Sequence, residues 1–104
     1  MNMKTNLHQP FVDIYGNALL DGNGKEQMID ETICRSLFSG AFLRPTNNME
    51  EDSKKKLDAF RLCMKISQAQ GEIELTSEEC TLVKQAASTL NPGGYGQVYN
   101  LIEK

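Results

Sequence analysis

The segment from Glu50 to Gln70, EEDSKKKLDAFRLCMKISQAQ, constrains the fold more than any other part of the chain. When it is placed on a helix at 100° per residue, its apolar residues fall on one half of the surface and its charged residues on the other. The apolar half comprises Leu57, Ala59, Phe60, Cys63, Met64 and Ile66. Such a helix needs a cover, and the flanking segments are too short to fold alone. The sequence therefore predicts one domain built around this central helix.

The length, composition and charge of the chain indicate what kind of domain it forms and which partners are disfavoured. A chain of 104 residues is sized for a single domain, 1–104, with one modest core. Its 39% hydrophobic and 24% charged residues are typical of a globular protein. The formal net charge is −3, and both signs are interspersed along the chain. Generic binding to nucleic acid or to an anionic membrane is disfavoured, because both require a basic surface.

The cysteines and the lengths of the hydrophobic stretches indicate the cellular compartment of the protein. The first residues carry no apolar stretch of signal-peptide length, and no window approaches eighteen consecutive apolar residues. Cys34, Cys63 and Cys80 are odd in number and lack the close spacing of zinc ligands. We therefore expect reduced thiols in helix cores and a cytoplasmic protein without a membrane segment.

The N-terminal third predicts β structure after a polar start. Residues 1–10 end in Pro10 and are expected to form a flexible arm. Residues 11–29 contain short aromatic and β-branched stretches separated by Gly16-Asn17 and by a second turn cluster at 21–24. This pattern predicts a β-hairpin or a small three-stranded meander, and no internal repeat is evident.

The remainder, 30–104, is predicted to be helical apart from a short extended piece at 72–75. Asp30 is expected to cap a first helix, which should end before Pro45. After the central helix, Thr76-Ser77-Glu78-Glu79 matches the capping box that opens a helix running to about Leu90. A last short helix is expected from Tyr95 to Glu103. The fold class is thus α+β, with an N-terminal hairpin or meander packed on about four helices.

Candidate chemistry is sparse. The glycine-rich run at 21–25 lacks the ligand pattern of a calcium loop and the spacing of a phosphate loop. His8, the one histidine, lies in the polar arm, and the paired acids at helix starts are explained by capping. The sequence therefore indicates no catalytic, cofactor-binding or metal-binding residue and no small-molecule substrate, and we predict a protein that is not an enzyme.

A helix-turn-helix at 77–104 is the alternative function that the sequence offers. Its second helix would present Gln97 and Asn100 to base edges, since amide side chains can pair bidentately with adenine. The one cation on that helix is Lys104, beside Glu103, so few phosphates would be neutralised. A DNA-binding transcriptional regulator is thus the second hypothesis, behind protein contact.

Protein contact is favoured by aromatic and Met residues near the edges of the predicted elements. Tyr95 and Tyr99 share one side of the last helix, and Met28 and Phe42 lie at element ends. These residue types are enriched at protein interfaces. The alternative that the two tyrosines close the core stays open. We predict a protein partner or self-association through these residues.

The order of these segments resembles that of small proteins encoded by bacteriophages and integrated prophages. The segments concerned are the polar start, FVDIYG at 11–16, the charged central helix, ELTSEE at 74–79 and GQVYNLIE at 96–103. The resemblance includes no catalytic or ligand motif. It implies a phage-type accessory protein in the host cytoplasm, an assembly factor or a modulator that acts by contact with itself or another protein.

Overall fold

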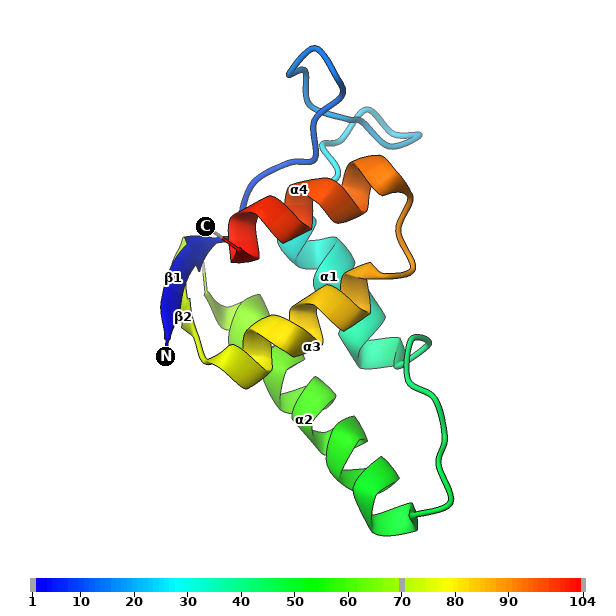
Figure 1. The fold of residues 1–104 in the computed structure, drawn as a ribbon. Coiled ribbons are helices and arrows are strands. Elements are labelled where there is room, and N and C mark those ends of the chain that lie inside the picture. Colours follow the sequence, from blue (N-terminus) through cyan, green and yellow to red (C-terminus); the bar gives the residue numbers. More distant parts are fainter. Residues whose placement is uncertain (1, 70, 104) are drawn as a thin grey trace.

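The computed structural model describes residues 2–69 and 71–103, which form a two-stranded antiparallel sheet and four helices (Figure 1). The predicted α+β class is confirmed. The described elements are β1 (Met3–Asn6), α1 (Ile29–Ser39), α2 (Met49–Gln68), β2 (Glu72–Leu75), α3 (Ser77–Ala87) and α4 (Pro92–Ile102). None of these helices combines the length and the apolar content needed to cross a membrane.

The sheet corrects the prediction of a flexible arm at 1–10. β1 lies within that segment and pairs with β2, with Thr5 opposite Ile73 and Met3 opposite Leu75. Ile73 and Leu75 are buried, in the alternating pattern of a strand with one face on the core. The β1 sequence MKTN has no such alternation, so its strand is imposed by β2 and by burial of the adjacent Leu7.

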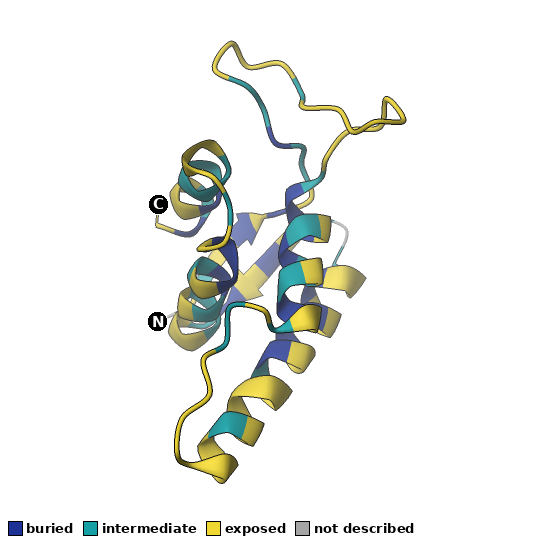
Figure 2. Ribbon diagram, turned by 90° about the vertical axis from the view of Figure 1, so that its right-hand side faces the viewer, coloured by how far each residue is buried: buried dark blue, intermediate teal, exposed yellow. Residues whose placement is uncertain are grey.

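The predicted meander at 11–29 contains pairings but no continuous strand. Isolated antiparallel bridges join Pro10 to Met28, Val12 to Ala18, and Leu20 to Glu26. The loops that they close project from the helical body at the top of Figure 1. Their outer parts are exposed, whereas their base at Phe11 is buried (Figure 2).

Helix α1 begins two residues earlier than the sequence suggested, with its N-cap at Met28 rather than Asp30. Met28 occupies the N-cap position without a side-chain hydrogen bond, so the predicted Asp30 cap is wrong. The Asp30 carboxylate instead accepts from the Glu31 amide and contacts His8. Gly40, at φ 68°, ends the helix in the left-handed conformation that favours glycine.

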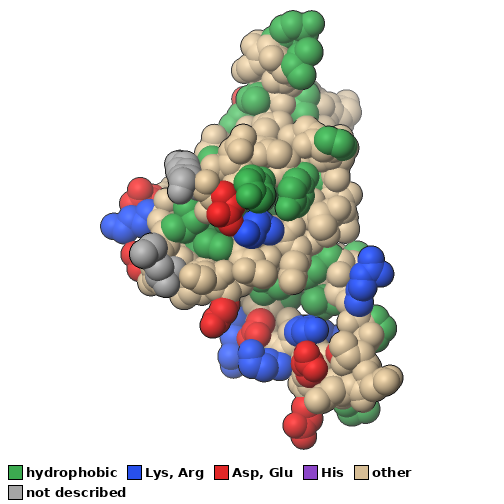
Figure 3. Space-filling model, viewed as in Figure 1, with side chains coloured by type: hydrophobic (Ala, Val, Ile, Leu, Met, Phe, Trp, Pro, Cys, Tyr) green, Lys and Arg blue, Asp and Glu red, His purple; other side chains and the backbone are tan. Residues whose placement is uncertain are grey.

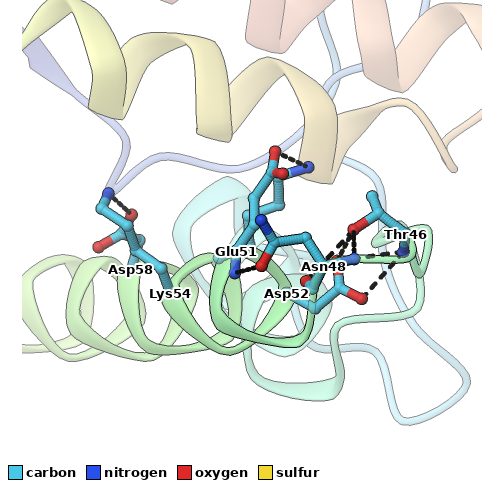
Figure 4. A network of polar contacts seen from close by, with 7 residues as sticks. Thr46, Asn48, Glu51, Asp52, Lys54 and Asp58 are labelled. Atoms are coloured by element: carbon cyan, nitrogen blue, oxygen red, sulfur yellow. Dashed lines mark hydrogen bonds and ion pairs between the residues drawn. The ribbon is translucent and has the colours of Figure 1, made fainter.

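Helix α2 is stabilised at its N-terminus by a network of polar contacts (Figure 4). The Asn48 side chain accepts from the Glu51 amide at 3.1 Å, as an N-cap should. Thr46 donates to the Asp52 carboxylate through both its amide and its hydroxyl. Further along the same surface, Lys54 pairs with Asp58 at 2.9 Å. This end of α2 therefore holds its helical form although it contributes little to the core.

Helix α3 packs against α1 and β2, and helix α4 packs against α3 and β1. The predicted capping box at Thr76 and Glu79 is present. Helix α4 starts at Pro92 rather than Tyr95, because Asn91 caps it and proline is well accommodated in the first turn. The core joins side chains from every element, including Leu7, Ile33, Leu37, Leu62, Ile66, Leu75, Val83 and Val98.

Candidate protein-contact surfaces

A short turn at 13–17, the Asp13 turn, is closed by one carboxylate. Asp13 Oδ1 accepts from the amides of Tyr15 at 2.8 Å and Asn17 at 3.0 Å. The Gly16 amide donates to the Asp13 carbonyl, and the Asp13 amide donates to the Asn17 carbonyl. Gly16 has φ 85°, which favours glycine. Aspartate and glycine therefore define this backbone.

A second turn at 21–25, the Asp21 turn, repeats the same pattern eight residues later. Asp21 Oδ1 accepts from the amides of Asn23 at 2.8 Å and Lys25 at 3.0 Å. Gly24 has φ 78°, and its amide donates to the Asp21 carbonyl. These amides, Lys25 first and then Asn23, hold the pKa of the Asp21 carboxyl below its usual 3.8. The chain therefore has an internal repeat that sequence analysis missed.

The repeat also closes at its base. The Phe11 amide donates to the Gln27 carbonyl at 2.9 Å, the Leu19 amide to the Phe11 carbonyl at 2.8 Å, and the Gln27 amide to the Leu19 carbonyl at 2.9 Å. Three positions eight residues apart thus form a closed ring of backbone hydrogen bonds. We call this ring, formed by the backbones of Phe11, Leu19 and Gln27, the platform, because both turns extend from it.

Helix α4 fixes this platform through Gln97. The Gln97 side chain accepts from the Val12 amide at 2.8 Å and donates to the Val12 carbonyl at 2.9 Å. It donates further to the Gly93 carbonyl at 3.0 Å. The amide expected to read adenine is therefore engaged within the molecule. Asn100 is exposed nearby, and Lys104 lies outside the described residues.

The two turns differ at their tips. The Asp13 turn carries Ile14 and Tyr15 there, 90% and 82% exposed. At the same positions the Asp21 turn carries Gly22 and Asn23. Figure 3 shows hydrophobic side chains at the end of the projecting loops. Since the second turn forms without them, the apolar pair is not needed for the fold.

A second exposed apolar surface, the α1–α2 face, comprises Phe38, Leu57, Phe60 and Met64. Phe38 and Phe60 are 71% and 49% exposed, and their ring centroids lie 6.5 Å apart. Leu57, Phe60 and Met64 follow one side of α2 at spacings of three and four residues. The helical pattern predicts that these three pack inward with the rest of the apolar half of α2, but they are exposed. The other three residues of that predicted half, Ala59, Cys63 and Ile66, are buried as expected. Leu62 completes the buried stripe.

A pocket of about 400 Å³ adjoins this face beside Phe38. It lies between the end of α1, the connector at 40–45 and the N-terminal half of α2. Its apolar lining includes Leu37, Leu43 and Ala59. A volume of this size is within the range of natural ligand pockets, so it has room for a few side chains of a partner.

Cations surround this pocket and face. Arg44, Lys55 and Lys56 line the pocket, and Arg61 follows on α2. Lys55 pairs with Glu51 at 3.6 Å. In the described part of the chain the other three form no ion pair. The acid in the pocket lining, Asp52, has its own pKa lowered chiefly by the hydrogen bonds from Thr46.

The contact residues predicted from the sequence do not form one surface. Tyr95 is half-buried against the core, whereas Tyr99 is exposed, with Lys84 5.8 Å above its ring. Phe42 is half-buried in the connector, and Met28 precedes α1. The two tyrosine rings lie 6.1 Å apart. Tyr99 is the member of this set most available to a partner.

One small pocket brings together ionisable residues that the sequence analysis had separated. His8 Nδ1 lies 2.8 Å from Asp30 Oδ2, and both line a pocket of about 230 Å³ with Cys34. Burial, followed by the neighbouring Cys63, raises the pKa of the Cys34 thiol to about 12. A thiol held neutral is a poor nucleophile. Across residues 2–69 and 71–103, no three His, Cys, Asp or Glu side chains gather closely enough to bind a metal ion.

Comparisons of the chain with models of known protein families, with curated proteins and with solved structures find no match.

Proposed function

We propose that this protein is a non-enzymatic accessory factor that acts by binding another protein through the α1–α2 face. The observation that supports this most is the exposure of Phe38 beside Phe60, with Leu57 and Met64 on the same side. Fully burying an exposed large apolar side chain yields about 1.5–3 kcal/mol. Phe38 would gain most of that on contact, and the other three, already about half covered, would each gain a part of it. Aromatic side chains and methionine are also common at the centres of interfaces.

The pocket and its cations add specificity to this surface. A partner that inserts side chains beside Phe38 would bring them close to Arg44 and Lys56, which have no ion pair in the described part of the chain. Acidic groups on the partner are therefore favoured, and basic ones are excluded by like-charge repulsion. The phage origin and cytoplasmic location implied by the sequence remain part of this proposal.

The DNA-binding alternative receives less support from the geometry. The side-chain amide of Gln97 is hydrogen-bonded to Val12 and Gly93. The exposed cations Lys56 and Arg61 lie on α2 rather than on α4, the supposed recognition helix. A reader of DNA needs its base-contacting amides and its phosphate-contacting cations on one surface.

Co-purification from the producing cell tests the proposal. The tagged wild-type chain is compared with Phe38→Ser/Phe60→Ser and with Met49→Ser, which removes an exposed apolar side chain outside the face. We expect the wild type and Met49→Ser to retain the same protein partner, another copy of the chain included, and the double variant to lose it. A partner that all three chains retain equally would refute the α1–α2 face as the contact surface.

A further inference from the structure

We propose that the partner of the α1–α2 face includes a second copy of this chain, whose Ile14–Tyr15 tip enters the pocket beside Phe38. This inference rests on the proposed function and names the occupant of its surface. It joins two features that the structure leaves without a role: an exposed apolar tip and an open apolar pocket with a cationic rim.

The Asp21 turn serves as an internal control for the tip. Both turns have the same carboxylate hydrogen bonds and the same positive φ at glycine, yet one carries Gly22 and Asn23 where the other carries Ile14 and Tyr15. Holding two large apolar side chains in water gives the folded monomer nothing. A contact outside the monomer gives this pair a role that the backbone of the turn does not.

Charge complementarity selects a second copy as the occupant. Residues 11–28 contain three acids, Asp13, Asp21 and Glu26, and one base, Lys25. The second carboxylate oxygen of Asp13 and of Asp21 accepts no hydrogen bond from the described residues. The pocket lining holds three cations, Arg44, Lys55 and Lys56, against one acid, Asp52, which accepts hydrogen bonds from Thr46. An acidic segment that delivers an apolar tip therefore matches an apolar pocket with a basic rim.

The tip cannot reach the pocket of its own chain. The loops lead into the N-terminus of α1, whereas Phe38 lies near its other end, along a helix about 16 Å long. In Figure 1 the loops lie at the top, beyond the N-terminal end of α1, whereas the connector leaves the opposite end of α1 and runs to the bottom of the molecule. The contact must therefore join two copies, with different surfaces contributed by each. Such head-to-tail contacts propagate into rings or chains.

Two other occupants fit less well. Pairing of two α1–α2 faces would bring Lys56 and Arg61 of both copies together, at a cost in like-charge repulsion. Insertion of the tip into an anionic membrane would bring Asp13 and Asp21 towards lipid phosphates. Both are separate outcomes of the test below.

Sedimentation velocity of the whole chain and two variants tests the inference. Ile14→Gly/Tyr15→Asn gives the first tip the sequence of the second, and Phe38→Ser/Lys56→Glu alters the pocket through exposed residues. We expect the wild type to sediment faster as its concentration rises, and each variant alone to remain a monomer. A mixture of the two variants should form a dimer and nothing larger, because it contains one intact tip and one intact pocket. Circular dichroism confirms that each variant is folded.

Several results would overturn the inference. A wild type that stays monomeric would do so, and so would variants that fail to complement each other. A tip variant that still dimerises would indicate pairing of two faces, and sedimentation of the wild type with phosphatidylserine vesicles, but not with itself, would indicate a membrane. If the chain is monomeric while co-purification still depends on Phe38 and Phe60, this inference fails and the proposed function stands.

Discussion

The Asp13 turn and the Asp21 turn share a backbone and differ in their tips. In both, one carboxylate oxygen accepts two amides and a glycine adopts positive φ. The first presents Ile14 and Tyr15 to solvent, and the second presents Gly22 and Asn23. The comparison separates residues that make the turn from residues that the turn carries. The aspartate and the glycine form the backbone of the turn, whereas the apolar side chains at its tip are available for binding.

The anchoring of the two turns also differs, and Gln97→Ala should have the largest effect on stability. Its side chain is hydrogen-bonded to Val12 beside the Asp13 turn, and among the described residues its hydrogen bonds do not reach the Asp21 turn. Losing these hydrogen bonds should lower the free energy of unfolding by about 1–3 kcal/mol in urea titration. Amide exchange should accelerate more at 13–17 than at 21–25.

The matched control for this variant is Asn100→Ala, on the next turn of α4 and exposed to solvent. It should change the free energy of unfolding by less than about 0.5 kcal/mol. Equal acceleration of exchange in both turns would contradict the assignment of Gln97 as an anchor of the first.

The positive-φ glycines of the two turns, Gly16 and Gly24, should respond alike. Gly16→Ala and Gly24→Ala meet open space but force a side chain into the left-handed region, at a cost of about 1–2 kcal/mol each. Gly22→Ala, where φ is not positive, should be neutral or slightly stabilising, because alanine restricts the unfolded chain. Thermal unfolding of the three variants measures this. A clear difference between Gly16→Ala and Gly24→Ala would break the equivalence of the turns.

Acid should open the Asp21 turn at a pH below the ordinary range for aspartate. The pKa of the Asp21 carboxyl is lowered by the amides of Lys25 and Asn23, so the folded turn favours the charged form. Its contribution to stability is present above the unfolded pKa and is lost as the pH falls through the folded one. Amide chemical shifts of Asn23 and Lys25 should titrate below 3.8. A midpoint above that value would contradict the carboxylate bonds.

Exchange of the tips should have the smallest effect on stability. Ile14→Gly/Tyr15→Asn and the reciprocal Gly22→Ile/Asn23→Tyr should each change the free energy of unfolding by less than about 1 kcal/mol, because these side chains lie in solvent. Urea titration checks both. A larger loss from the first exchange would mean that the apolar tip supports the fold and is not free for contact.

The sequence predicted the elements whose signals are local. The capping box at Thr76 and the long periodic pattern of α2 appear in the structure as expected. β1 was missed because its four residues lack alternation and depend on pairing with β2, more than sixty residues away. The start of α4 was placed late because Pro92 and Gly93 suggested a break rather than a first turn.

The candidate surfaces could be predicted from the sequence only in part. The eight-residue spacing of Asp13–Gly16 and Asp21–Gly24 was a usable signal, although the remaining residues of the two turns differ. Periodicity put Leu57, Phe60 and Met64 in the core, since an amphipathic pattern shows that a face is apolar but not what covers it. The pocket joins α1, the connector and α2, and no local pattern reports such a juxtaposition.

A dilution series of the wild-type chain, followed residue by residue with amide chemical shifts, tests the central claim most directly. The series runs from roughly 1 mM to roughly 10 µM, a range that covers the dissociation constants of weak protein contacts. We predict that amides at 14–15 and beside Phe38 shift together with one dissociation constant, while those at 22–23 do not move. Shifts of equal size in both turns, or none at any concentration, would contradict the account.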